Sequence, residues 1–253
     1  NIQMVYVMKK SGDYSASIDE EKKYAERKFE ELLTEYSPKL ENDSKLRYII
    51  KSGKIFAEIV HQAHSYKNSI IAASTHGASG FEEFFIGSNA FKIISATKQP
   101  VITIRKGYVP EAINKIILPI NPVIESRQKV PYTVELARLF NAEIDVISVC
   151  TGKDKKVVAK LSQYVKQVSE YIDSHQIPFK SKDLTGENIA DLVVNYASEE
   201  KGDLISIITE KESSLNIFSG SFAHQVINKA NVPVLNLSPR DLRIASSFRT
   251  TGG

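Results

Sequence analysis

Cysteine and tryptophan are scarce in this chain of 253 residues, which has Cys150 as its single cysteine and no tryptophan. One cysteine cannot form an intrachain disulfide, so we expect a fold without disulfides in a reducing cytoplasm. No apolar run approaches the ~20 residues that a membrane-spanning helix needs. The first residues do not have the pattern of a signal peptide. A cytoplasmic protein without a membrane partner is therefore predicted.

A strong excess of one charge is also lacking. The 33 basic and 30 acidic residues leave a net charge of +3, and charged residues make up 25% of the chain. Nucleic-acid-binding domains usually carry a basic face or stripe, so no nucleic-acid partner is expected. The apolar fraction of 42% is ordinary for a globular protein, and the length suits one large or two ordinary domains.

The chain contains an internal repeat. Gly53 aligns with Gly186, and the offset of 133 residues then holds without a gap to the end of each copy. Shared glycine and proline positions support the alignment, because Gly87-Ser88 aligns with Gly220-Ser221 and Pro100-Val101 aligns with Pro233-Val234. Two copies of one domain are predicted. The boundaries are 1–106 for the first copy, 107–113 for a linker, 114–240 for the second copy and 241–253 for a tail.

Strands and helices alternate along the second copy. Helix 154–174, for example, has apolar residues three and four apart, which indicates an amphipathic helix packed on a sheet. The pattern predicts α/β architecture, with two tandem doubly wound parallel sheets of five strands, flavodoxin- or Rossmann-like. The predicted elements of this copy are strands 115–118, 144–149, 179–184, 204–208 and 234–237, and helices 127–140, 154–174, 188–197 and 221–230.

The first copy starts at the equivalent of the second strand. Its predicted elements are strands 2–7, 46–51, 70–73 and 101–104, and helices 17–40, 55–65 and 89–96. By comparison with the second copy, roughly thirty residues carrying a first strand and helix are expected before Asn1. In a flavodoxin-like order that strand is central. We therefore expect either a fragment or a neighbouring chain that supplies the strand.

A phosphate-binding pattern follows the predicted strand 70–73. Ser74, Gly77, Gly87 and Ser88 punctuate the connection, and a helix begins near Asn89. Glycines let the backbone approach an anion closely, and unpaired amides at a helix start point toward it. A purely structural turn with the same glycines is the alternative interpretation, and His76 is more simply an exposed loop residue.

Ser74-x2-Gly77-x9-Gly87-Ser88 resembles the Gly-x2-Gly-x9-Gly-Ser/Thr signature of the universal stress protein family, and Ser74-Thr-His-Gly77 resembles its Gly-Thr-His-Gly wording. Nearly the whole chain is similar to a tandem member of that family. The resemblance implies that an ATP-type nucleotide, which Mg²⁺ can accompany, contacts Ala73, Ser74, Gly77, Gly87, Ser88 and Asn89. It also implies that Val7 lies beside the adenine. Ser74 replaces the first glycine of the signature.

The second copy departs further from this signature. Ile207 and Glu210 occupy the two glycine positions, and a carboxylate there would repel phosphates. By resemblance, Pro119, Asn121 and Val149 lie where the family holds the base and the ribose, and Gly220 and Ser221 retain the last part of the signature. We expect this copy to bind no triphosphate.

Other candidate sites are weak. His61 and His64 have a spacing that could hold a metal, but no third ligand stands nearby, so no metal is predicted. Arg127 and Lys129 are interpreted as solvated residues at a helix start. No Ser-His-Asp set or paired acids can be assembled, so no catalytic residue is named.

Three functions remain open. The first is a cytoplasmic stress-response protein that binds an adenine nucleotide through the first copy and is not an enzyme, slow incidental hydrolysis aside. The second is a dimeric interaction module without nucleotide. In the family the last strands often pair, so Val101–Ile104 and Val234–Leu237 are candidates for pairing within the chain or in a homodimer. The third and weakest is an enzyme such as a nucleotidyl transferase.

Overall fold

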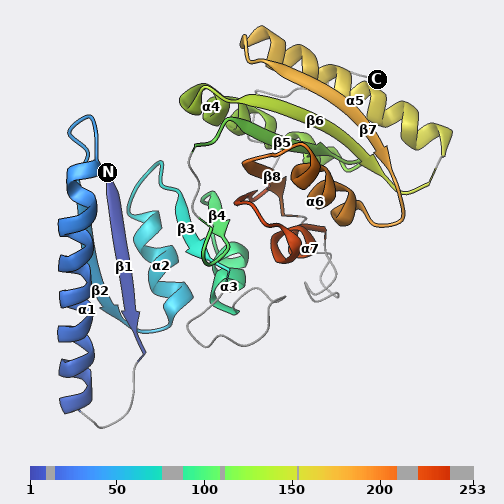
Figure 1. The fold of residues 1–253 in the computed structure, drawn as a ribbon. Helices are drawn as coiled ribbons and strands as arrows, with labels where there is room; N and C mark the ends of the chain where they lie inside the picture. Colours follow the sequence, from blue (N-terminus) through green and yellow to red (C-terminus); the bar gives the residue numbers. More distant parts are fainter. Residues whose placement is uncertain (10–14, 76–87, 109–111, 153, 210–221, 240–253) are drawn as a thin grey trace. The chain divides into compact units, whose positions relative to one another are not determined.

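The computed structural model describes residues 1–9, 15–75, 88–108, 112–152, 154–209 and 222–239 (Figure 1). The chain divides into two compact units, Asn1–Ser69 and Ile70–Gly253. Among the described residues, no helix combines the length and the apolar character that crossing a membrane requires.

The first unit is built on a parallel pair of strands. Strand β1 (Ile2–Met8) pairs with β2 (Leu46–Ser52) in a continuous register from Ile2 opposite Leu46 to Met8 opposite Ser52. Phe29 of the long connecting helix stacks on Tyr48 of β2, with ring centroids 4.7 Å apart. The helical elements of the unit are α1 (Ser15–Tyr36), the 3₁₀ helix η1 (Ser37–Lys39) and α2 (Ile55–His64).

Helix α1 is rich in Glu, Lys, Ala and Leu, which favour helix formation, and ion pairs such as Lys22–Glu26 lie one turn apart. Pro38 follows two residues after its end and has no amide to continue it. Most of its side chains are exposed, and Ala25 is the buried residue among those described. The helix therefore covers the strands with one narrow face.

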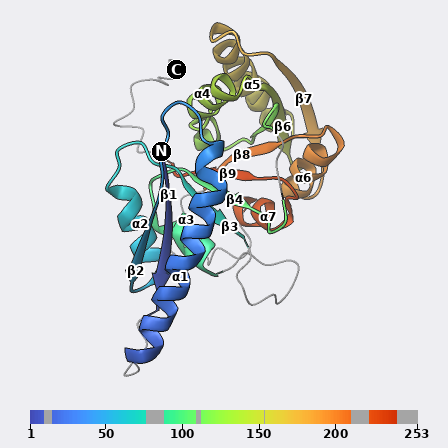
Figure 2. The same cartoon turned by 60° about the vertical axis from the view of Figure 1, so that its left-hand side comes forward.

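The second unit is built on a seven-stranded sheet with the order β3-β4-β9-β8-β5-β6-β7 (Figures 1 and 2). The strands are β3 (Ile71–Ser74), β4 (Val101–Ile104), β5 (Lys115–Ile120), β6 (Glu143–Cys150), β7 (Phe179–Thr185), β8 (Leu204–Ile208) and β9 (Val234–Leu237). The helices are α3 (Ser88–Ala96), η2 (Ile124–Arg127), α4 (Val130–Phe140), α5 (Lys155–Ser174), α6 (Ile189–Glu199) and α7 (Phe222–Lys229).

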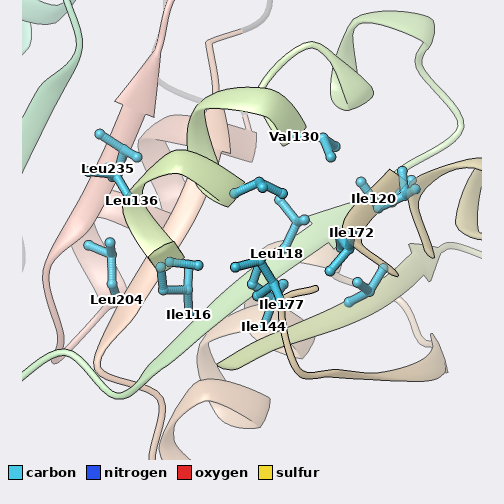
Figure 3. Packing of buried hydrophobic residues seen from close by; sticks show 14 of the residues in the cluster. Ile116, Leu118, Ile120, Val130, Leu136, Ile144, Ile172, Ile177, Leu204 and Leu235 are labelled. Atoms are coloured by element: carbon cyan, nitrogen blue, oxygen red, sulfur yellow. The ribbon is translucent and has the colours of Figure 1, made fainter. Parts of the chain in front are cut away.

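The second copy is a complete doubly wound domain. Its five strands, numbered along the copy, have the order 3-2-1-4-5, with β5 between β6 and β8. Apolar residues of β5 pack with residues of α4 and α5 in the main core, including Ile116, Leu118, Val130 and Ile172 (Figure 3). Strand β5 is buried over most of its length because helices cover both faces of a parallel sheet.

The two copies join through their last strands. Strands β4 and β9 pair antiparallel, with Ile102 opposite Leu235, and these residues are equivalent under the 133-residue offset (Figure 2). The pairing therefore has a local two-fold axis near Ile102. Both strands are those expected from the sequence to pair, and the pairing within the chain is confirmed.

Some details of the sequence interpretation are wrong. Strand β5 continues through Pro119 to Ile120. Its pairing with β8 ends at Ile117, so no hydrogen bond to β8 is lost because Pro119 lacks a backbone N–H. The helix expected from Arg127 begins at Val130 and follows η2. In the first copy β1 and β2 form one sheet, while β3 and β4 belong to another. In the second copy β5 lies between β6 and β8, which are the equivalents of β1 and β3. The described part of the first copy has no counterpart of β5.

Candidate functional site

The carboxyl edge of β3 carries the start of the candidate phosphate site. Ser74 is the last residue of β3 and is exposed, while Ala73 is half-buried. Ser74 lies opposite Ile104 in the parallel register of β3 and β4, and the amide of Thr75 donates to the Ile104 carbonyl at 3.0 Å. This edge of the second unit therefore presents the first residue of the signature. Gly77 and Gly87 lie outside the described residues.

The start of α3 carries the other end of the signature. Ser88 and Asn89 are exposed in its first turn, whereas Ala90, Ile93 and Ile94 are buried and anchor the helix. The first amides of any α-helix have no carbonyl partner within the helix and carry a partial positive charge. These amides can donate to an anion.

Val7, the predicted adenine contact, lies in the first unit. It is 7% exposed and sits opposite Lys51 in the β1–β2 pair. Ala73, Ser74, Ser88 and Asn89 lie in the second unit. The residues assigned to the base and to the phosphates thus belong to different compact units.

In the second copy, Pro119, Asn121 and Val149 lie at or near the carboxyl ends of the neighbouring strands β5 and β6. The Asn121 side chain is already engaged, because its Oδ1 accepts from the Val123 amide at 3.1 Å. The Ser126 hydroxyl donates to the Asn121 carbonyl at 3.0 Å. Asn121 thus closes its own turn, and this contact uses one of the two acceptor positions of its side-chain oxygen.

The strand that carries the second copy's signature also differs. Ile207, the equivalent of Ser74, is fully buried inside β8. Glu210, Gly220 and Ser221 lie outside the described residues. A buried isoleucine offers no hydrogen bond where the first copy has an exposed hydroxyl.

Lys129 was expected to be solvated, but it is 2% exposed. Its ammonium donates to the Ser126 carbonyl at 2.5 Å. Burial lowers the pKa of Lys129 to about 7. The signal for this burial was in the sequence: Lys129 precedes the buried Thr133 and Ala137 by one and two turns, so it belongs to the inner face of α4.

Arg127 was likewise expected to be solvated, but it is 4% exposed. Its guanidinium lies over the Tyr164 ring, 3.7 Å from the centroid, and donates to the Gln167 side chain. Burial lowers its pKa, and Tyr164 acts in the opposite direction. The contact with α5 is tertiary, and periodicity within one element could not reveal it.

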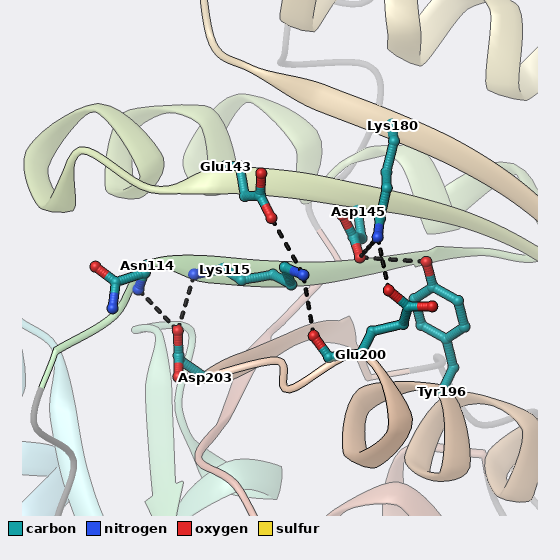
Figure 4. A network of polar contacts seen from close by, with 8 residues as sticks. All are labelled: Asn114, Lys115, Glu143, Asp145, Lys180, Tyr196, Glu200 and Asp203. Atoms are coloured by element: carbon teal, nitrogen blue, oxygen red, sulfur yellow. Dashed lines mark hydrogen bonds and ion pairs between the residues drawn. The ribbon is translucent and has the colours of Figure 1, made fainter.

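A polar network lies near the amino ends of β5, β6 and β7 (Figure 4). Asp145 is 1% exposed, and its Oδ2 accepts from the Tyr196 hydroxyl at 3.2 Å and lies 3.3 Å from the Lys180 ammonium. Lys180 also binds Glu200 at 2.7 Å, and the pKa of Lys180 is raised by Glu200 first and by Asp145 next. Burial and the Asp145 charge raise the pKa of Tyr196 to about 12.

These contacts tie β6 and β7 to α6 at the amino edge of the second copy's strands, opposite the carboxyl edge where that copy's own signature begins, so we assign the network to stability. His61 and His64 both lie on α2 and are exposed. Within the described ranges, no three His, Cys, Asp or Glu side chains are grouped so as to hold a metal ion.

Comparison with known proteins agrees with the fold and the repeat. A universal stress protein from Archaeoglobus fulgidus DSM 4304 superimposes with a TM-score of 0.76 at 19% identity, covering 95% of this chain and 87% of that chain. A putative universal stress protein from Pseudomonas aeruginosa UCBPP-PA14 superimposes with a TM-score of 0.65 at 14% identity, covering 94% and 93%. No curated protein matches the sequence. The sequence model of the universal stress protein family matches residues 2–105 and again residues 112–237. The chain therefore belongs to the universal stress protein family, as a tandem member with two copies of the domain.

Proposed function

We propose that this universal stress protein binds an adenine nucleotide of the ATP type through its first copy. The observation that carries the proposal is the order of elements at one edge. Strand β3 ends at the exposed Ser74, and α3 begins at Ser88. The amides of the first turn of α3 have no carbonyl partner within the helix. In the sequence, Gly77 and Gly87 separate these ends, and small residues leave room for a polyanion.

The second copy is proposed to bind no triphosphate. Ile207 is buried, Asn121 Oδ1 is used by Val123, and the sequence has Glu210 where the signature has glycine. We therefore expect one nucleotide for each chain. Mg²⁺ would accompany the triphosphate, since hard oxygen ligands suit it.

The role we propose is that of a binding protein rather than an enzyme, acting in the cytoplasm in a stress response. The second candidate is an interaction module without nucleotide. The β4–β9 pairing is an interaction of this kind between the two copies, and each copy already uses its last strand in it. A homodimer would then have to form through another surface.

One experiment separates these candidates. The purified chain is denatured and searched for released nucleotide, and ATP with Mg²⁺ is titrated calorimetrically into the wild type and Gly87→Asp. The added carboxylate should abolish binding by repelling the phosphates. Ser95→Asp is the matched control, because Ser95 is exposed at the other end of α3 and the variant adds the same charge.

No released nucleotide and no saturable binding by the wild type would favour the interaction module. Equal binding by the wild type and Gly87→Asp would place the nucleotide elsewhere. Rapid hydrolysis that a single side-chain change abolishes would favour an enzyme.

A further inference from the structure

Two buried cations lie directly before helix α4 and have no acidic partner in the described part of the chain. Arg127 and Lys129 are 4% and 2% exposed, and neither forms an ion pair with a described residue, although Glu125 precedes them in η2. Burial alone lowers the pKa of Lys129, with no contribution from a neighbouring charge. A buried charge of this kind is costly unless a counter-charge accompanies it.

Both cations also have hydrogen-bond donors to spare. The Lys129 ammonium has three donors and uses one of them, for the Ser126 carbonyl at 2.5 Å, while the described residues supply no acceptor for the other two. The buried Nε of Arg127 has no hydrogen-bond partner among them either, and its guanidinium contacts the neutral side chains of Tyr164 and Gln167. Buried donors without a partner indicate a bound water or ion.

The amino end of α4 adds positive potential at the same place. The Lys129 side chain reaches back to Ser126, so its ammonium lies before the first turn of the helix. No side chain caps α4, and its first turn contains no acid. Because the amino end of a helix carries a partial positive charge, a lysine there adds charge of the same sign. An anion would compensate the helix end and the lysine together.

The fold places this cluster where doubly wound domains hold ligands. The strand order 3-2-1-4-5 of the second copy reverses between β5 and β8, and such domains bind ligands outside the carboxyl ends of the strands at that point. Helix η2 follows the carboxyl end of β5 and contacts both β5 and β8. On α4, the Thr133 hydroxyl lies 2.7 Å from the Ser206 hydroxyl of β8. Lys129 therefore lies beside the point of reversal.

From these observations we propose that the second copy binds a small oxyanion of the phosphate class, held by Lys129 and the first amides of α4, with Arg127 as a second positive charge. Little of either side chain reaches solvent, so the ligand is smaller than a nucleotide. The inference is independent of the nucleotide proposed for the first copy and gives the second copy a ligand of its own. It also gives a reason for a lysine where an apolar side chain would avoid the cost of burial.

The test is a calorimetric titration of inorganic phosphate at pH 7 into the full-length wild type and into Gly87→Asp, which blocks the phosphate site proposed for the first copy. Saturable binding of one phosphate for each chain should persist in Gly87→Asp. In either background, Lys129→Met should weaken that binding by about tenfold or more, as expected for one lost hydrogen bond to a charged group. Lys166→Met is the matched control, since it removes one positive charge from a side chain that is 79% exposed and should leave binding within about twofold.

Arg127→Gln is the second variant, and it should also weaken phosphate binding by removing a buried charge near the ligand. Urea unfolding supplies a second readout, because a ligand that binds only the folded state stabilises it: phosphate should raise the unfolding midpoint of the wild type and leave that of Lys129→Met unchanged. No saturable binding of phosphate by the wild type, or binding by Lys129→Met within twofold of it, would overturn this inference and leave the proposed function standing. A wild type that binds phosphate as described but no ATP would overturn the proposed function alone.

Discussion

Replacing Lys129 by methionine is expected to stabilise the protein at neutral pH. The Lys129 side chain is 2% exposed, and its ammonium has one hydrogen bond, to the Ser126 carbonyl. No carboxylate forms an ion pair with it among the residues that the structure describes. Methionine has a similar length and no charge to desolvate, so it can occupy the same space between α4 and the sheet.

The magnitude follows from the pKa. Burial lowers the pKa of Lys129 from its ordinary 10.5 to about 7. Because the folded-state pKa is the lower one, the unfolded chain binds more protons between these values, and the stability of the wild type rises with pH across that window. The penalty, which is the reduction in the free energy of unfolding caused by the buried charge, is complete below pH 7. At about 1.4 kcal/mol for each pH unit between the two pKa values, it is on the order of 4 kcal/mol at pH 7.

Methionine also loses the hydrogen bond to the Ser126 carbonyl, which subtracts about 1 kcal/mol. We therefore expect Lys129→Met to raise the free energy of unfolding by about 3 kcal/mol at pH 7, and by less than about 1 kcal/mol at pH 9.5. Urea unfolding of both proteins at the two pH values measures these gains. Lys166→Met is the control, because Lys166 is 79% exposed and its removal should change stability little at either pH.

A gain that is the same at both pH values would show that packing, and not a buried charge, sets the difference. A loss of stability at pH 7 would refute the burial argument itself.

Two further predictions concern the second unit. Tyr196→Phe should remove one tyrosine that ionises near pH 12 in an ultraviolet titration and should lower stability by about 1–2 kcal/mol, since Asp145 loses a donor; loss of a tyrosine that ionises near the ordinary pKa of 10.0 instead would contradict the assigned contact. Leu235→Ala should cost about 2–5 kcal/mol, because Leu235 is fully buried where the two copies pair, whereas Leu139→Ala at a site 77% exposed should cost little; equal losses in urea unfolding would refute the pairing as a source of stability.

The sequence predicted much of this fold because its strands are apolar runs with clear ends. Strands β4, β8 and β9 begin and end at the predicted residues, and Pro100 and Pro233 precede β4 and β9. The 133-residue repeat located equivalent elements in both copies, and the resemblance to the family predicted the pairing of the equivalent strands β4 and β9.

The remainder depends on tertiary contacts that no local pattern contains. The burial of Arg127 comes from its contact with the Tyr164 ring, thirty-seven residues later in the sequence. The hydrogen bond from Arg105 to Asn231 joins the two copies. Lys129 is different, since its spacing from Thr133 and Ala137 indicated the inner face of α4, and its charge led to the wrong interpretation.

The site was predicted in part. The sequence located Ser74 at a strand end and Asn89 in the first turn of a helix, and the structure places both there. It did not reveal that Asn121 closes its own turn, because that hydrogen bond depends on the backbone path after β5.

The number of nucleotides bound by each chain tests the central claim most directly. Equilibrium dialysis of the wild-type protein against labelled ATP with Mg²⁺ measures it. We expect saturation at one nucleotide for each chain, because the sequence has Gly77 in the first copy where the second copy has Glu210. Saturation at two would show that the second copy binds as well, and the absence of saturable binding would show that the first copy's edge is a structural turn.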